Sequence, residues 1–131
     1  MQQGRLEHLN MTVSDVTKTA RMLCRLFDWQ IRWQGESIDA GWSAHVGADN
    51  NYIALYAPPG DTRKASNSYT SHRGPNHVGV VVENLEEMQA RVEDAGFTVR
   101  TVEPYAPGRR FYFYDDDNIE WEVLSYAEKP G

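Results

Sequence analysis

The sequence has little cysteine, a deficit of basic residues and no long apolar run, and each shortage excludes a class of protein. The single cysteine, Cys24, has no partner for a disulfide within the chain, which excludes a disulfide-stabilised secreted fold. The 13 Lys and Arg are outnumbered by 19 Asp and Glu, giving a net charge of −6, which disfavours nucleic acid or an anionic membrane as partner. No apolar run approaches the length of a transmembrane helix.

The start of the chain and its composition favour an ordinary globular protein. Residues 1–5 are polar and lack the apolar segment of a signal peptide, so we expect a cytoplasmic protein. A chain of 131 residues with 40% hydrophobic residues is long and apolar enough for one domain, or for two small modules that share a core.

A short sequence phrase occurs twice in the chain. His8 opens the first copy, HLNMTVSD, and His77 opens the second, HVGVVVEN. In both copies an apolar run follows the histidine, and an Asp or Asn suited to capping a helix stands seven residues after it. The two copies are separated by about half the chain. This repeat predicts a duplicated module with a pseudo-symmetric site between the copies.

The same order of elements is predicted in each half. In the first half we expect a strand at 6–13, a helix from 16 to about 28, and strands at 30–34, 42–46 and 51–57; the helix is indicated by the apolar spacing of Val16, Ala20, Leu23 and Phe27. In the second half we expect a strand at 77–82, a helix between Asn84 and Gly96, and strands at 98–103, 109–114 and 119–126. Asn84 with Glu87 is typical of a capping box.

These elements predict an α+β fold made of two βαβββ modules, at 1–57 and 77–131. The segment 58–76 between them is rich in Pro, Gly, Ser and charged residues, which predicts a linker without helix or strand. Its length is unusual for a compact domain. A plain connector and a lid over a site are both compatible with it.

Two glutamates near the C-terminal end are candidates for a site. An acidic turn at 115–118 precedes the last strand, in which Glu120 and Glu122 share one face and Trp121 and Val123 share the other. A carboxylate in a half-buried strand is costly unless it is paired or bound to a cation. A solvent-exposed face is the simpler interpretation, and for Glu120 it is the one we favour.

This region resembles the vicinal oxygen chelate superfamily, which includes glyoxalase I, fosfomycin-resistance proteins, extradiol dioxygenases and bleomycin-resistance proteins. The family's last strand follows an Asp-Pro-Asp-Gly turn and carries a metal-binding Glu seven residues after the first Asp, which corresponds to Glu122 when counted from Asp115. The phrase RFYFY at 110–114 resembles the strand before it. Asp116 replaces the usual Pro and Asn118 the usual Gly, but Asn also tolerates the left-handed conformation.

The resemblance implies a site and an architecture. Both modules would form a curved mixed sheet around a shared cavity, with His8, His77 and Glu122 as metal ligands. The matching position in the first half falls on Ala54, which cannot bind a metal. A set of two His and one Glu resembles the ligand sets of the extradiol dioxygenases and fosfomycin-resistance enzymes. Such a set would hold Fe(II), Mn(II), Ni(II) or Zn(II). The family also implies a homodimer, in which the site forms within one chain or across two.

Other residues are candidates for contacts with a substrate. Glu120, where it is not solvated, is a candidate to support a metal ligand or to accept a proton, and either Glu120 or Tyr112 would transfer a proton or orient the substrate. A second group would bind a small oxygenated substrate: Arg110, Tyr105, Trp42 and Tyr56. His45, His72 and Cys24 are interpreted as ordinary structural or surface residues.

The sequence therefore predicts a metal-dependent enzyme that chelates neighbouring oxygens of a small molecule. Glyoxalase-like lyase, thiol transferase acting on an epoxide, and ring-cleaving dioxygenase activities all remain open. The alternative is a metal-free protein that binds a small molecule, as the bleomycin-resistance members do.

Overall fold

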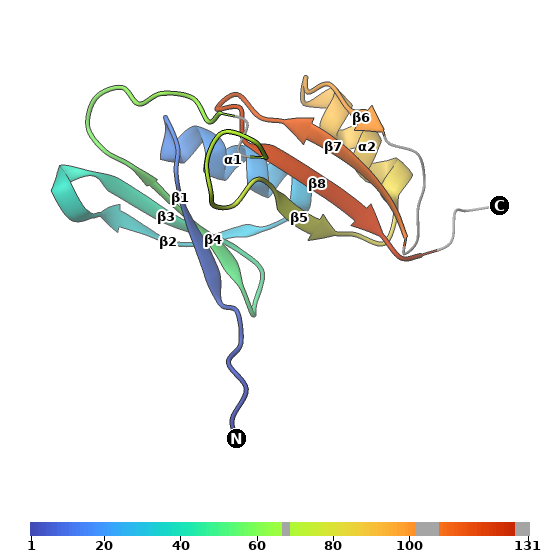
Figure 1. The fold of residues 1–131 in the computed structure, drawn as a ribbon, viewed down its shortest axis with the longest axis horizontal. Helices are drawn as coiled ribbons and strands as arrows, with labels where there is room; N and C mark the ends of the chain where they lie inside the picture. Colours follow the sequence, from blue (N-terminus) through green and yellow to red (C-terminus); the bar gives the residue numbers. More distant parts are fainter. Residues whose placement is uncertain (67–68, 102–107, 128–131) are drawn as a thin grey trace. The chain divides into compact units, whose positions relative to one another are not determined.

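The computed structural model describes residues 1–66, 69–101 and 108–127, and the chain divides into two compact units (Figure 1). The first unit is Met1–Arg63 and the second is Lys64–Gly131. The boundary lies inside the predicted linker at 58–76. The later part of that segment therefore belongs with the second unit.

The first unit is a four-stranded mixed sheet with one long helix. Its elements are β1 (His8–Thr12), α1 (Val16–Phe27), β2 (Gln30–Glu36), the short 3₁₀ helix η1 (Ile38–Ala40), β3 (Trp42–Gly47) and β4 (Tyr52–Ala57). The strand order is β1-β4-β3-β2. Strand β1 runs parallel to β4, and the other neighbours are antiparallel.

Helix α1 begins and ends where the sequence predicts. The Asp15 side chain accepts a hydrogen bond from the backbone N–H of Lys18, which satisfies a donor of the first turn. Asp28 ends the helix in the left-handed conformation, with φ 57°. The apolar face, which includes the fully buried Leu23 and Leu26, packs on β3 and β4.

The second unit repeats this architecture. Its elements are β5 (Val78–Val81), α2 (Leu85–Asp94), β6 (Arg100–Thr101), β7 (Arg109–Tyr114) and β8 (Glu120–Ser125). The strand order β5-β8-β7-β6 is the order of the first unit, again with a parallel first pair. The predicted α+β fold with two βαβββ modules is confirmed.

Helix α2 forms only half of the predicted capping box. The Asn84 side chain accepts from the backbone N–H of Glu87 at 2.9 Å. The Glu87 carboxylate pairs instead with Arg91 one turn later, at 3.0 Å, because the i, i+4 spacing brings these side chains together. After the helix, Gly96 adopts a positive φ of 96°, which fits the predicted role of glycine beyond a helix end.

The sheet of the second unit has one apolar and one polar face. Phe111, Phe113, Trp121 and Val123 are fully buried on the face against which α2 packs. Because side chains alternate along a strand, the residues between them point to the other side. We call that side the site face. In the described part of the chain, no helix is both long and apolar enough to cross a membrane.

Candidate functional site

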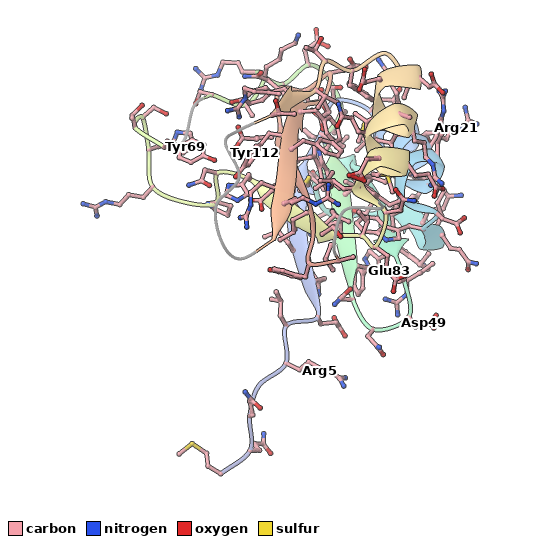
Figure 2. All side chains as sticks on the ribbon, turned by 90° about the vertical axis from the view of Figure 1, so that its right-hand side faces the viewer. Arg5, Arg21, Asp49, Tyr69, Glu83 and Tyr112 are labelled. Carbon is pink, nitrogen blue, oxygen red and sulfur yellow. The ribbon has the colours of Figure 1, made fainter. Side chains whose placement is uncertain are left out.

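Two buried carboxylates occupy the site face of the second unit. Glu120 and Glu122 are only 4% and 7% exposed, so the interpretation of Glu120 as a solvated residue is wrong. In the strand register Glu122 lies between Gly79 of β5 and Tyr112 of β7. Figure 2 shows the labelled Tyr112 on the opposite side of the sheet from α2. Buried carboxylates require charged or hydrogen-bonding partners, and both have them.

Glu122 lies between a histidine and an arginine. Its Oε1 is 3.1 Å from Nε2 of His77, and its Oε2 accepts from Nη1 of Arg110 at 3.3 Å. Both glutamate oxygens are therefore in contact with nitrogen atoms. The structure brings together the predicted ligands His77 and Glu122 and the predicted substrate residue Arg110.

Glu120 is held by a different pair of donors. Its Oε1 accepts from the Tyr69 hydroxyl at 2.5 Å, and its Oε2 accepts from Nη2 of Arg100 at 2.8 Å. The Arg100 guanidinium also lies over the Tyr112 ring, 5.0 Å from its centroid. The hydrogen bond to Glu120, followed by burial, raises the pKa of Tyr69, and the same causes raise the pKa of Tyr114. Both phenols therefore remain protonated at neutral pH.

The contacts of His77 indicate which of its nitrogens carries the hydrogen. Nδ1 lies 2.6 Å from Oδ1 of Asn76 and 3.0 Å from the Tyr69 oxygen. Because the only hydroxyl hydrogen of Tyr69 is donated to Glu120, Nδ1 must be the donor to Tyr69. Nε2 is the nitrogen that faces Glu122.

This arrangement fits a bound cation. Nε2 and the carboxylate oxygen lie 3.1 Å apart, a separation at which a proton or a cation can be shared between them. Neutral imidazole and carboxylate are common ligands of divalent transition metals. Among residues 1–66, 69–101 and 108–127, no group of three or more His, Cys, Asp or Glu side chains is gathered as a complete metal site. Within the second unit, His77 and Glu122 are the pair of side chains that could bind an ion.

The corresponding face of the first unit carries stacked rings. His8 stacks on Tyr52 with centroids 4.9 Å apart, and Tyr52 stacks on His45 at 4.6 Å. Nδ1 of His8 is 2.9 Å from Oε1 of Glu7, which also accepts from the Tyr52 hydroxyl at 3.1 Å. Burial lowers the pKa of His45, and the positive charges of His8 and Arg32 lower it further. Glu7 thus holds the His8 ring at Nδ1, and Tyr52 stacks on one face of it.

The remaining predicted substrate residues are dispersed. Tyr56 lies on the His8 face and donates its hydroxyl hydrogen to the Ile38 carbonyl at 3.0 Å. Trp42 shares the strand face of Ala44 and Val46, on the side covered by α1, and is 42% exposed at the strand end. Tyr105 lies outside the described residues.

Four contributors to the site were not identified from the sequence. Asn76 and Tyr69 come from the predicted linker, which has no periodic pattern to indicate a facing direction. Arg100 and Tyr114 lie in predicted strands. Alternation with Tyr112 could have placed Tyr114 on the face of Glu120 and Glu122, whereas the place of Arg100 follows from its pairing with Tyr112 across two strands.

Comparisons with known proteins agree with this fold. A family profile described as the Glyoxalase/Bleomycin resistance protein/Dioxygenase superfamily matches residues 5–123. The chain belongs to this superfamily. A comparison with curated proteins gave no significant match.

Solved structures of superfamily proteins are similar along nearly the whole chain. A glyoxylase/bleomycin resistance protein/dioxygenase domain from Frankia sp. EAN1pec is 22% identical, with TM-score 0.80, covering 95% of this chain and 98% of that one. The fosfomycin resistance protein FosX from Mesorhizobium loti is 25% identical, with TM-score 0.69, covering 95% and 92%. A FosX mutant from Listeria monocytogenes, complexed with Mn(II) and 1S,2S-dihydroxypropylphosphonic acid, is 23% identical, with TM-score 0.72, covering 95% and 93%.

The two units of this superfamily member differ at one equivalent position. In the first unit the residue two after His8, Asn10, pairs with Ala54. In the second unit the residue two after His77, Gly79, pairs with Glu122. The strand registers therefore give Ala54 and Glu122 equivalent places. The first unit offers no carboxylate where the second has one.

Proposed function

We propose that this protein is a metal-dependent enzyme that binds a small oxygenated substrate at a divalent ion held by His8, His77 and Glu122. The observation that carries the proposal is the 3.1 Å approach of Nε2 of His77 to Glu122, while Nδ1 of the same ring is turned toward Asn76 and Tyr69. A cation placed between Nε2 and the carboxylate would be bound by both.

His8 is proposed as the third ligand because it occupies the position in its unit that His77 occupies in the second. Its Nδ1 contacts Glu7 at 2.9 Å, which leaves Nε2 as the nitrogen available to a metal. A carboxylate on the far nitrogen is a common partner of a metal-binding histidine. His8 would come from the same chain, or from a second copy in a homodimer.

The side chains around Glu122 favour an anionic or strongly polar substrate. Arg110 is 3.3 Å from Glu122, so it would meet any substrate group bound beside this ligand, and guanidinium suits bidentate contacts with oxyanions. When bound, the metal would act as a Lewis acid that polarises neighbouring substrate oxygens. Ala54 supplies no fourth ligand, which would leave positions open for them. The phenol of Tyr112 lies opposite Glu122 in the register and is proposed to orient the substrate.

The nature of the metal and of the reaction is proposed from the relatives. One FosX structure contains Mn(II) together with a dihydroxypropylphosphonic acid, so Mn(II) is the first ion to test, before Fe(II), Ni(II) and Zn(II). Opening of an epoxide on a small phosphonate is the first reaction to test. Hemithioacetal isomerisation and catechol cleavage represent the other two branches.

The experiment is metal analysis of protein purified without chelators, followed by these three assays with each ion. We expect about one bound ion per site, and activity in one assay that His77→Ala abolishes. His72→Ala is the matched control, because His72 is an exposed histidine bonded to serines. Absence of bound metal after reconstitution, or equal activity in His77→Ala, would contradict the proposal.

One observation favours a second candidate, a metal-free protein that binds an aromatic molecule. The stacked rings of His8, Tyr52 and His45 continue to Trp33, 5.0 Å from His45, and offer an aromatic surface. Such a protein would bind a planar ligand with the same affinity before and after His77→Ala, and would contain no metal.

A further inference from the structure

One aromatic ring from each strand forms a row across the sheet of the first unit. The strand order is β1-β4-β3-β2 (Figure 1), and the rings follow it as His8, Tyr52, His45 and Trp33. The centroids of neighbouring rings are 4.9, 4.6 and 5.0 Å apart. The row therefore leads from the proposed metal ligand on one edge strand to an indole on the other.

A bulge in β2 brings a charged side chain to the same face. The register of β2 with β3 shifts between Ile31 and Trp33, so Arg32 has no partner across the strands. Consecutive side chains of a strand normally point to opposite faces, but a bulge changes the direction of the residue that it inserts. The Arg32 guanidinium consequently lies over the Tyr52 ring, 4.8 Å from its centroid. Arg32 and Trp33 thus reach the same row of rings.

Two glycines leave room for these two side chains. Gly47 stands beside Tyr52 in the register, so no side chain of β3 separates the Tyr52 ring from β2 at that point. Gly35 lies against the Trp33 ring, because a Cβ added to this glycine would come within 2.9 Å of the indole. The indole therefore lies along its own strand, and Trp33 remains 48% exposed.

The charge of Arg32 suits an anionic ligand. In the described part of the chain, no hydrogen bond or ion pair joins its guanidinium to another residue, and the Glu7 carboxylate on this face is held by His8 and by the Tyr52 hydroxyl. A guanidinium over a ring keeps its N–H groups in its own plane, where a carboxylate can accept two of them. An exposed indole can stack on a planar group.

We propose that Arg32 and Trp33 form a subsite for a planar anion of the aromatic carboxylate class, in which Trp33 stacks on the ring and Arg32 binds the acid group. The subsite belongs to the first unit and needs no metal ion. Its occupation by the substrate of the enzyme rests on the proposed function. A molecule whose oxygens chelate the ion at His8 would extend along the row of rings toward Trp33, and its class would be an aromatic acid.

The test is an NMR titration of the intact, metal-free chain with three matched probes. Benzoate is planar and anionic, benzyl alcohol has the same ring without the charge, and cyclohexanecarboxylate has the charge without the planar ring. We expect benzoate to shift the indole N–H signal of Trp33. We also expect its Kd to be about 10-fold lower than that of either other probe, because it alone uses both side chains.

Variants identify the side chains that bind the probe. Arg32→Gln should raise the Kd for benzoate about 10-fold and leave that for benzyl alcohol unchanged, since the acid group alone loses its partner. Trp33→Leu should raise both values about 3- to 10-fold. Gly35→Ala keeps both side chains but displaces the indole, and should also weaken both probes. The controls are Arg21→Gln, at an exposed arginine of α1 (Figure 2), and Trp42→Leu, on the side of the sheet covered by α1; neither should change the Kd.

Three results would overturn the proposal: no binding of benzoate, equal Kd values for the three probes, or a Kd for benzoate that Arg32→Gln and Trp33→Leu leave unchanged. Mn(II) titration of wild type and Arg32→Gln separates this proposal from the proposed function. If benzoate binds as expected and neither protein binds a metal ion, the subsite stands and the metal-dependent function is wrong. If both proteins bind Mn(II) with equal affinity and benzoate does not bind, the metal site stands and the subsite is wrong.

Discussion

Replacing Asp115 by asparagine should destabilise the turn that precedes Glu120 and Glu122. Asp115 is 8% exposed. Its Oδ1 accepts from the backbone N–H groups of Asp117 and Ile119, each at 2.9 Å, and its Oδ2 accepts from the indole N–H of Trp121 at 3.0 Å. Asparagine has one oxygen, which can serve the two backbone donors. Its amide N–H₂ would then face the indole N–H, leaving a buried donor without an acceptor.

The expected cost follows from that single unsatisfied donor. A buried donor without a partner costs about 1–3 kcal/mol, so we expect Asp115→Asn to lower the free energy of unfolding by about 2 kcal/mol. Asp115→Ala leaves all three donors without this acceptor and should cost about 3–5 kcal/mol. Urea unfolding followed by circular dichroism measures both free energies of unfolding.

The pH dependence gives an independent check on the role of Asp115. Burial raises the pKa of this carboxyl, although the hydrogen bonds from Trp121 and the backbone oppose the rise. A carboxyl with a raised pKa in the folded state contributes stability that is present below its unfolded pKa and is lost as pH rises through its folded pKa. The difference in free energy of unfolding between wild type and Asp115→Asn should therefore become smaller as pH rises from the unfolded pKa of Asp115 through its folded pKa. Equal free energies of unfolding in the two proteins would show that the Asp115 carboxyl does not hold the turn. A difference that widens as pH rises would show that its pKa is not raised by folding.

Substitutions at three further positions test the first unit. Leu23→Ala should lower the free energy of unfolding by about 2–5 kcal/mol, because Leu23 on the inner face of α1 is fully buried and its truncation leaves a cavity. A decrease below about 1 kcal/mol in urea unfolding would contradict this packing. Asp15→Ala should cost about 1 kcal/mol, since the carboxylate accepts from the Lys18 backbone N–H at 3.1 Å, and Asp15→Asn, which keeps an acceptor, should cost less. Burial lowers the pKa of His45, so its contribution to stability is present above its unfolded pKa and is lost as pH falls through the folded value. The free energy of unfolding of His45→Gln should therefore fall less in acid than that of wild type. The same dependence on pH in both proteins would show that His45 does not cause the loss of stability in acid.

The repeat in the sequence was sufficient to predict the fold, because each half contains complete local signals. Asp15 and Asn84 mark the helix starts, and the alternation of Trp121 and Val123 with two glutamates identifies the two faces of the last strand. The turn at Asn118 formed as predicted, with a left-handed backbone. These features depend on residues close together in the chain.

The environment of the site could not be predicted in the same way. Alternation places Glu120 on a face but does not say what lies against that face, and one of its hydrogen-bond partners, Tyr69, is distant in sequence. Tyr69 lies in a segment without helix or strand, where composition indicates a linker and gives no direction to a side chain. Trp42 was predicted to bind substrate because it is aromatic. The strand register places it instead on the same face as Ala44.

Binding of a divalent metal ion by His77 and Glu122 can be measured by calorimetric titration of metal-free protein with Mn(II). The titration compares wild type with Glu122→Gln and with the control Glu86→Gln, whose carboxylate pairs with Arg109 outside the site. We predict stoichiometric binding to wild type and to the control, and a Kd at least about 100-fold higher in Glu122→Gln, which corresponds to a loss of about 2.7 kcal/mol. Equal affinity in wild type and Glu122→Gln would show that Glu122 does not bind the ion.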